Sequence, residues 1–462
     1  MPLGLSATFP NAILNLAMYQ DTIAAISTPL GEGGIGIVRL SGESARDITE
    51  QIFNNSLSDH RLVYGHIIDP QSGETIDEVL VSYMAPPRTY TLEDIVEINC
   101  HGGIVPLQRI LELVLKLGAR SAEPGEFTLR AFLNGRLDLS QAESVLDIVQ
   151  AKTKESLRLA VDGLKGKLSN RITAIRDELL PVLACLTARI DFPDDEVEDQ
   201  EVPGPIRSAR EQLQKLIASS DAGIIYRQGI RTAIVGRPNV GKSSLLNLLL
   251  RQSRAIVTPI PGTTRDTLEE VVNIKGIPFV LVDTAGIIES KDLVESLGIE
   301  RSRRAIDQAS LVVFVIDTSE SLTDTDRKIF RLVEGKTVLA AANKSDLSSE
   351  ADLSELRWPI VHTSAISGEG IERLENLMAE LALGGTITPS DSLLVGNMRH
   401  KEALERAEAH LAAALKSVEG NMPEDFVTID LKMALDALGE ITGESVTEEL
   451  LNMIFSRFCI GK

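Results

Sequence analysis

The sequence predicts a multidomain α/β protein in which an α+β N-terminal domain precedes a helical domain, and an α/β domain interrupts that helical domain. Three patterns indicate this order. Short β-like runs alternate with Gly/Pro turns up to residue 136, strands alternate with helices over 228–384, and helical periodicity dominates 137–227 and 385–462. We expect the two helical stretches to form one discontinuous all-α domain, because an insertion is tolerated where the host chain leaves and returns at neighbouring points.

Length and composition limit the class of protein. A chain of 462 residues suggests about three domains, and 43% hydrophobic with 24% charged residues is typical of globular proteins. The net charge of −21 argues against extensive wrapping of nucleic acid but leaves room for a local basic site. Three distant cysteines without a CxxC spacing favour a reducing, cytoplasmic location. The longest apolar runs, of about six residues, are too short for a membrane span.

The N-terminal domain, 1–136, has the pattern of a small sheet. Strands are expected at 36–40, 78–83 and 95–99, and a helix near 105–117. Residues 1–20 contain no basic residue, which argues against a mitochondrial transit peptide. We interpret them as a short disordered tail or the product of an upstream start codon.

The first helical stretch carries one long apolar stripe. From Leu157 to Ile190, apolar residues recur at steps of three, four or seven, which predicts one long helix or two stacked helices. Pro181 lies inside the stripe and is expected to kink or break it. The acidic run at 191–201 is interpreted as a solvated linker. A metal site is the less favoured alternative, because a flexible run does not fix ligand geometry.

The interrupting domain has five expected strands. They lie at 232–235, 279–282, 311–316, 338–342 and 360–363, with helical segments between them, which is typical of a mostly parallel sheet covered by helices. After Pro389, apolar residues at helical spacing return in two series that begin at Leu404 and Leu431.

A phosphate-binding loop is the strongest motif in the chain. Residues 236–243 read Gly-Arg-Pro-Asn-Val-Gly-Lys-Ser, directly after a predicted strand and before the helical run 244–250. In such a loop, backbone N–H groups surround the phosphates and Lys242 contacts the β- and γ-phosphates, while the Ser243 hydroxyl can ligate Mg²⁺. The motif predicts a nucleoside triphosphatase.

A second motif indicates which base is bound. Asn343-Lys344-Ser345-Asp346 follows a predicted strand, and the Asp346 carboxylate can accept hydrogen bonds from guanine N1–H and its exocyclic amine. Adenine offers no such pair of donors, so a site built in this way rejects it. Ser364-Ala365, after the next strand, could present a backbone N–H to the guanine carbonyl.

Two more motifs lie between these. Asp283-Thr-Ala-Gly286 follows a predicted strand, so Asp283 can hold Mg²⁺ through water and the Gly286 N–H can contact the γ-phosphate. In the upstream GTTRD segment, Thr264 can complete the Mg²⁺ shell. The four motifs in this order predict a Ras-like P-loop G domain.

The G domain lacks one common catalytic side chain. Many GTPases have a water-orienting Gln after the DxxG glycine, but this chain has Ile287 there. Another group must then orient water, and Glu289 and Glu295 are candidates. No arginine finger within the chain is evident, so the charge of the transition state must be neutralised in another way.

The chain resembles the MnmE (TrmE) family of tRNA-modification GTPases over essentially its whole length. Its phosphate loop, GTTRD and DTAG segments are shared with other Era-like GTPases. The more specific segments are DTIAAISTP (21–29), GGIGIVR (33–39), EINCHGG (97–103), PGEFTLRAFLN (124–134), LDLSQAE (137–143) and CIGK (459–462).

This resemblance implies that GTP hydrolysis is stimulated by K⁺, which promotes transient pairing of two G domains and supplies the charge of an arginine finger. The positions that match the K⁺ ligands are Asn239, Thr258, Ile260 and Thr263. Glu295 matches the glutamate that orients water, which leaves Glu289 as a surface residue. Lys242, Glu295 and Cys459 are therefore the expected catalytic residues, and Ser243 and Thr264 the expected Mg²⁺ ligands.

The expected GTP-binding residues come from all four motifs. They are Asn239, Val240, Gly241, Lys242, Ser243, Ser244, Thr258, Pro259, Ile260, Pro261, Gly262, Thr263, Thr264, Asp283, Thr284, Ala285, Gly286, Asn343, Lys344, Ser345, Asp346, Ser364, Ala365 and Ile366.

The resemblance also implies a folate site in the N-terminal domain, which would dimerise. A 5-formyl- or 5,10-methylene-tetrahydrofolate would be the one-carbon source, and the matching contact positions are Arg39, Glu97, Arg136 and Lys462. Cys459 matches a cysteine assigned to the carbon transfer; the alternative is a structural cysteine packed in the core.

The implied reaction needs a partner. With MnmG, a flavin- and NADH-dependent protein, the family forms a heterotetramer that adds an aminomethyl or carboxymethylaminomethyl group to the wobble uridine of tRNA. One alternative is an Era-like GTPase switch in ribosome assembly, although the mixed charge of the helical tail does not resemble a basic RNA-binding module. The other is a folate-binding sensor of one-carbon supply.

Overall fold

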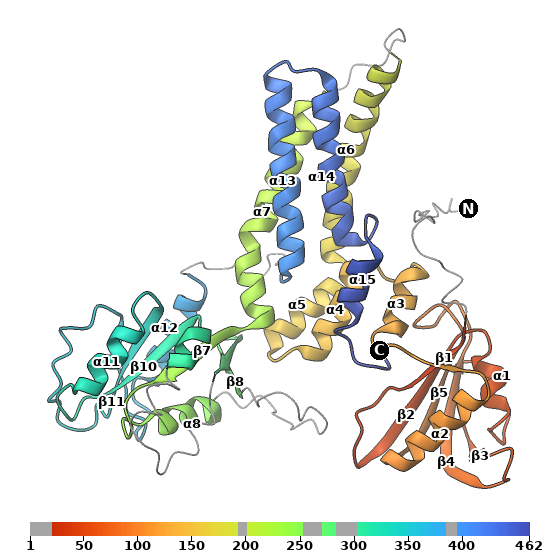
Figure 1. Ribbon diagram of the computed structural model, residues 1–462, viewed down its shortest axis with the longest axis horizontal. Coiled ribbons are helices and arrows are strands. Elements are labelled where there is room, and N and C mark those ends of the chain that lie inside the picture. The colour runs from red at the N-terminus through yellow and green to blue at the C-terminus, as the bar shows by residue number, and fades with distance from the viewer. Residues whose placement is uncertain (1–20, 193–200, 253–269, 283–302, 385–394) are drawn as a thin grey trace.

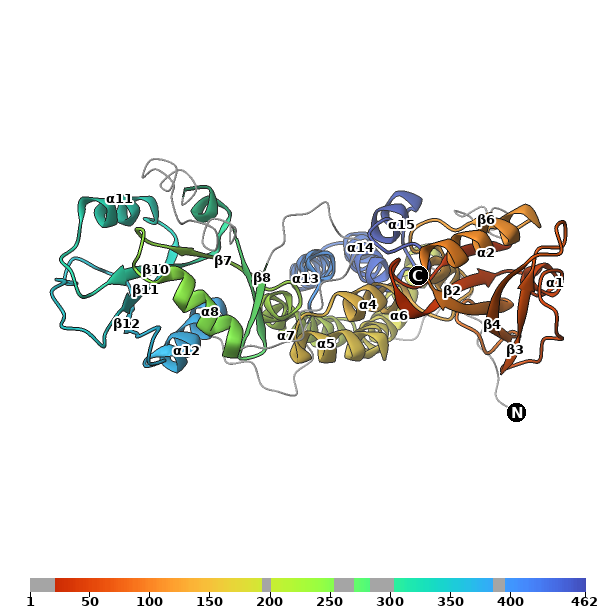
Figure 2. The ribbon, with the colours of Figure 1, turned by 90° about the horizontal axis from the view of Figure 1, so that it is seen from below.

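The computed structural model describes residues 21–192, 201–252, 270–282, 303–384 and 395–462. The N-terminal sheet lies on one side of an elongated helical domain, and the α/β domain lies on the other (Figures 1 and 2). The expected order of an α+β domain, a helical domain and an inserted α/β domain is therefore confirmed.

The N-terminal domain is a six-stranded sheet with the order β3-β4-β5-β2-β1-β6. Its strands are β1 (Ile23–Ile26), β2 (Gly33–Ser41), β3 (Arg61–Ile68), β4 (Thr75–Met84), β5 (Ile95–Gly102) and β6 (Arg120–Ser121). Its helices are α1 (Ala45–Glu50), α2 (Ile104–Lys116) and α3 (Glu126–Leu133). Buried Leu107, Ile110 and Val114 recur at helical spacing, so one face of α2 packs on the sheet.

The helical domain is built from both parts of the chain. Its helices are α4 (Leu139–Gln150), α5 (Lys154–Leu164), α6 (Lys167–Asp191), α7 (Pro203–Gln228), α13 (Met398–Glu419), α14 (Glu424–Thr442) and α15 (Glu448–Phe455). Helices α6, α7, α13 and α14 share one apolar core (Figure 1). Residues on either side of the inserted domain thus form one discontinuous domain, as predicted.

The apolar stripe of the first helical stretch is interrupted at a different point from the one predicted. Helix α6 continues through Pro181, and the chain breaks instead between α5 and α6, where Gly166 has a φ of 75°. Leu179 and Val182 on either side of the proline are fully buried, so packing offsets the lost N–H donor. The ends of the stripe, Leu157 and Ile190, are 42% and 37% exposed.

The inserted domain contains a second six-stranded sheet with the order β12-β11-β10-β7-β9-β8. Its strands are β7 (Ile230–Val235), β8 (Glu270–Ile274), β9 (Ile277–Leu281), β10 (Leu311–Asp317), β11 (Thr337–Asn343) and β12 (Ile360–His362). Only β8 runs antiparallel to its neighbour within this described sheet. The helices α8 (Lys242–Gln252), α11 (Asp324–Leu332) and α12 (Ile371–Ala382) belong to this domain. The five predicted strands are confirmed, whereas β8 was not predicted.

The points where the chain leaves and rejoins the helical domain lie together. A Cβ atom on Gly223, near the end of α7, would fall 2.5 Å from the Val395 carbonyl oxygen. A polar group centred on the buried residues Glu143 and His400, the hinge cluster, joins this point to α4. Its members are Glu143, Asp147, Arg227, Asn397, Arg399 and His400.

Helix α4 supplies the carboxylates of the hinge cluster. The Glu143 carboxylate accepts hydrogen bonds from Arg399 Nη2 and His400 Nε2, both at 2.6 Å, and Asp147 pairs with Arg227 at 2.6 Å. Burial alone would raise the pKa of Glu143, but attraction to His400 and Arg399 outweighs it and holds the pKa far below its usual range. The inserted domain is therefore anchored at both ends to one helix.

Candidate functional site

The phosphate loop connects β7 to α8 and contains three residues with positive φ. Gly236, Asn239 and Gly241 have φ values of 154°, 65° and 99°. The Lys242 ammonium donates hydrogen bonds to the main-chain oxygens of Gly236 at 2.9 Å and Arg237 at 2.8 Å. Burial lowers the pKa of Lys242 to about 8. A bound triphosphate would replace these neutral acceptors with anionic oxygens and raise that pKa.

A single buried amide joins the phosphate loop to the base-recognition loops. Asn343, at the end of β11, is 1% exposed, and its Nδ2 donates to the Val240 carbonyl at 2.8 Å. Its Oδ1 accepts from the Ala365 N–H at 3.1 Å. Gly241 must lack a side chain here, because a Cβ atom would lie 2.2 Å from Asn343 Nδ2. Asn343 thus joins a segment about a hundred residues before it to one 22 residues after it.

Lys344 makes an ion pair that sequence reasoning missed. It has a φ of 65°, and its ammonium lies 2.6 Å from the carboxylate of Asp317. Asp317 ends the buried strand β10 and also accepts from the Ser319 hydroxyl at 2.6 Å. Burial opposes ionisation of Asp317, but these donors outweigh it and lower its pKa. In the sequence, Asp317 could have been noticed as a carboxylate directly after an apolar predicted strand.

The other predicted nucleotide contacts have different surroundings. Asp346 is exposed, as are Ser243 and Ser244 at the start of α8. Ile366 is 88% exposed, on a turn in which the Ser364 hydroxyl accepts the N–H groups of residues 366 and 367. The remaining predicted contacts, 258–264, 283–286 and Glu295, lie outside the described residues.

The N-terminal sheet positions a second group of predicted site residues. Arg39 on β2 and Glu97 on β5 are opposite one another in the antiparallel register, and Arg39 Nη2 lies 2.7 Å from the Glu97 carboxylate. Arg39 Nη1 also donates to the Gly461 carbonyl at 3.1 Å. The guanidinium carbon lies 5.7 Å from the centre of the Phe127 ring. The cross-strand pair therefore contacts the C-terminal segment next to Lys462.

Arg136 reaches the same neighbourhood through Tyr90, which sequence reasoning did not identify. The Arg136 guanidinium lies 4.7 Å from the centre of the Tyr90 ring, and its Nη1 donates to the Tyr90 carbonyl at 3.2 Å. Burial raises the pKa of Tyr90, although the charges of Arg136 and Arg39 oppose that change. Tyr90 thus contacts Arg136 directly, and its hydroxyl contacts Thr128, the neighbour of the Phe127 ring that lies beside Arg39. The chain has five tyrosines, and nothing in the sequence distinguishes Tyr90 from the other four as a site residue.

The C-terminal segment exposes its cysteine. Phe458 is buried, and it would lie 3.0 Å from a Cβ atom on Gly125. Cys459 is exposed and Lys462 is half-buried. The alternative of a core-packed cysteine is therefore wrong, because the neighbouring phenylalanine occupies the core instead.

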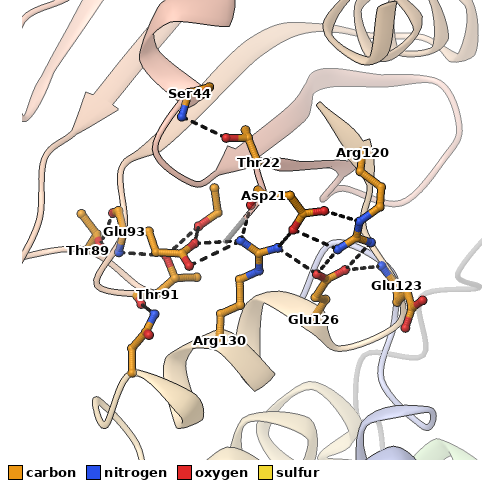
Figure 3. Close-up of polar contacts among 12 residues, drawn as sticks. Asp21, Thr22, Ser44, Thr89, Thr91, Glu93, Arg120, Glu123, Glu126 and Arg130 are labelled. Carbon is orange, nitrogen blue, oxygen red and sulfur yellow. Dashed lines mark hydrogen bonds and ion pairs between the residues drawn. The ribbon is translucent and has the colours of Figure 1, made fainter. Parts of the chain in front are cut away.

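A charged network holds helix α3 beside this site (Figure 3). Arg130 is 1% exposed, and it donates to the Asp21 carboxylate at 2.7 Å and the Glu126 carboxylate at 3.0 Å. Arg120 pairs with the same two carboxylates. Phe127 and Thr128 follow Glu126 directly, so the network also fixes their positions. The Phe127 ring lies near Arg39, and the Thr128 hydroxyl lies 2.9 Å from the Tyr90 hydroxyl.

Comparison with known proteins identifies the family. Residues 22–136 match the family model of the GTP-binding protein TrmE N-terminus, and residues 139–459 match that of the MnmE helical domain. The chain belongs to the MnmE family. It is therefore a GTPase of tRNA modification with a Ras-like G domain, and both assignments agree with the sequence predictions.

Relatives match this MnmE chain over nearly its whole length. The tRNA modification GTPase MnmE of Thermoanaerobacter sp. (strain X514) is 51% identical over 460 residues, which cover 96% of this chain and 100% of the relative. That of Desulforamulus reducens is 48% identical over 461 residues, with the same coverage.

A solved structure, the G domain of the T. maritima FeoB iron transporter, covers 33% of this MnmE chain and 98% of its own at 28% identity, with a TM-score of 0.26. Within the described part of the chain, no helix is long and apolar enough to cross a membrane.

Proposed function

We propose that the chain is a K⁺-dependent GTP hydrolase that acts with MnmG to add an aminomethyl or carboxymethylaminomethyl group to C5 of the tRNA wobble uridine. Membership of the MnmE family carries this proposal. The chain would act in the cytoplasm as a homodimer through its N-terminal domain, within a heterotetramer with MnmG.

Support for GTP and its ions comes from the G domain. Lys242 is placed against the loop that would surround phosphates, and Asn343 holds the base-recognition segments to it. Ser243 would ligate Mg²⁺ together with Thr264, and Asn239 would ligate K⁺ together with residues of the 258–263 segment. Positive charge near the β,γ-bridge is what hydrolysis requires, since no arginine finger is evident.

Support for a tetrahydrofolate comes from the donors and acceptors around Tyr90. A pterin offers N–H donors that suit the Glu97 carboxylate, and its glutamyl tail offers carboxylates that suit Arg39, Arg136 and Lys462. When bound, the folate supplies the one-carbon unit. Exposed Cys459 lies three residues before Lys462 and would take part in the transfer.

Mass spectrometry of nucleosides from bulk tRNA tests the proposal. Cells without the protein should lose the 5-substituted wobble uridine, and the wild type should restore it. Asp346→Asn should not restore it, because the amide cannot accept both guanine donors. Asp324→Asn is the matched control, since that carboxylate is 92% exposed on α11. An unchanged nucleoside profile, with co-purifying ribosomal subunits, would favour the GTPase switch in ribosome assembly.

Ion dependence is a separate prediction. GTP turnover by the purified chain should be faster in KCl than in NaCl at the same ionic strength, because the proposed K⁺ supplies transition-state charge. The rates are compared under saturating GTP and Mg²⁺. Equal rates in both salts would remove K⁺ from the mechanism but leave the tRNA function in place.

A further inference from the structure

A cavity of about 680 Å³ lies between helices α6 and α7 in the helical domain. Each helix contributes polar side chains from one face, because the lining positions recur at steps of three and four. Helix α6 provides Lys167, Asn170 and Arg171, and α7 provides Gln212, Lys215 and Ser219. Three cations and three neutral hydrogen-bonding groups thus surround one hollow.

Two of these cations lack the carboxylate partners that other cations of the helical domain have. Arg210 pairs with Glu408 at 2.8 Å, and Arg406 pairs with Glu440 at 2.6 Å. Within the described residues, Arg171 and Lys215 form no ion pair, and both are exposed. Their charge is consequently available to an anion from outside.

Not every group in the cavity is free. Lys167 lies 2.9 Å from the Asp162 carboxylate, and its side chain is still 54% exposed. The Gln212 amide donates to Glu178 at 2.9 Å and to the Ser208 hydroxyl at 3.2 Å. Arg171 and Lys215 are therefore the residues on which an anion-binding role depends.

The surrounding segment is basic on an acidic chain. Residues 151–178, which include the Glu178 partner of Gln212, contain seven Lys or Arg and four Asp or Glu, a net charge of +3, whereas the whole chain carries −21. Helix α6 begins at Lys167 with no acidic residue in its first turn, so its N-terminal dipole adds positive potential. An extended polyanion would be repelled by most of the surface and attracted here.

We infer that the cavity and its cationic rim bind the phosphodiester backbone of the RNA substrate, an inference that rests on the proposed function. Lysine, arginine and neutral amides are the side chains that contact phosphate oxygens. The lining contains no aromatic residue on which a base could stack, so the site binds backbone and does not read sequence.

Binding of a labelled tRNA transcript to the full chain tests this site. Arg171→Gln/Lys215→Gln should weaken binding roughly tenfold at 100 mM KCl, and should reduce the slope of log affinity against log salt by about two, because each phosphate contact contributes about 0.9. Lys328→Gln/Arg331→Gln, exposed on α11, removes the same charge elsewhere and should bind as the wild type does. Arg171→Lys/Lys215→Arg should keep the wild-type slope.

Folding and function are measured on the same variants. GTP turnover and the thermal unfolding midpoint should be unchanged, because neither residue belongs to the nucleotide site. Glutamine variants that bind tRNA with wild-type affinity and slope, or a wild type that binds none, would overturn the inference. Displacement of the tRNA by poly-glutamate at equal charge concentration would overturn it in favour of an acidic protein partner.

The two proposals fail in different ways. If the glutamine variants lose tRNA binding but deletion leaves the nucleoside profile unchanged, the RNA site stands and the proposed modification does not. If deletion abolishes the modified uridine while the glutamine variants bind normally, the modification stands and this site does not.

Discussion

Lys242 illustrates how burial prepares one residue for its ligand. Among the described residues, the ammonium donates to two neutral carbonyl oxygens, and burial disfavours its charged form, so the pKa falls to about 8. A triphosphate would restore the charged form. The energetic consequence is a coupling between nucleotide binding and proton uptake.

We predict that GTP binding takes up protons at pH 8.5 to 9. Well below pH 8, Lys242 is charged in both states and little uptake occurs. Above its free pKa the lysine is neutral in the empty loop and charged in the complex, so up to one proton is taken up and affinity falls as pH rises. Calorimetric titrations in buffers of different ionisation enthalpy measure this.

Lys242→Arg is the matched control for proton uptake, since a guanidinium stays charged throughout this range. If the wild type and the arginine variant take up the same number of protons on GTP binding, Lys242 is already charged in the empty loop.

The sequence predicted single residues better than it predicted their partners. Asn343 and Arg39 were identified by motif or resemblance, but the motif could not show that Asn343 hydrogen-bonds Val240, over a hundred residues away. Tyr90 and Asp317 were missed because each gains its role only through a contact made in the fold. Local spacing contains no information about such contacts.

At the scale of elements, the hinge cluster ties α4 to both ends of the inserted domain. Glu143→Ala should cost about 3–5 kcal/mol of unfolding free energy, because it leaves the partly buried Arg399 guanidinium without its anion and the buried His400 ring without its hydrogen-bond acceptor. Glu419→Ala is the control, since its pair with Arg207 is exposed and should contribute less than about 1 kcal/mol. Urea unfolding followed by helical circular dichroism measures both.

The hinge cluster should also make stability depend on pH. The folded pKa of Glu143 is lowered, so its contribution is present above the unfolded pKa and is lost as pH falls below it. The difference between wild type and Glu143→Ala should therefore shrink in acid. Equal stability of the two proteins at pH 7 would show that the cluster does not hold the hinge.

Elements with a clear periodic pattern were predicted, and elements defined by their neighbours were not. Strands β10 and β11 contain unbroken apolar runs and were predicted, whereas β6 has only two residues and exists through its pairing with β1. Pro181 was expected to kink or break the helix, but α6 continues through it because buried residues on both sides pack into the core.

At the scale of the whole molecule, the inserted domain should be removable. Within the described residues, the core of α6, α7, α13 and α14 contains no side chain from the G domain, and Gly223 adjoins Val395. Replacing residues 229–394 by a short Gly/Ser linker should leave a folded helical domain without GTPase activity. Circular dichroism and thermal unfolding check this. A shortened chain that aggregates or lacks helical signal would mean that the G domain holds the helical domain together.

The interrupted helical core also has a consequence during translation. Helix α7 leaves the ribosome about 170 residues before α13 begins, and α6 leaves earlier still. At roughly 5–20 residues per second, their apolar faces wait on the order of 10–30 s for their partners. Through that interval the nascent chain exposes a half-built core, which makes it a natural client for ribosome-associated chaperones, while the G domain can already fold.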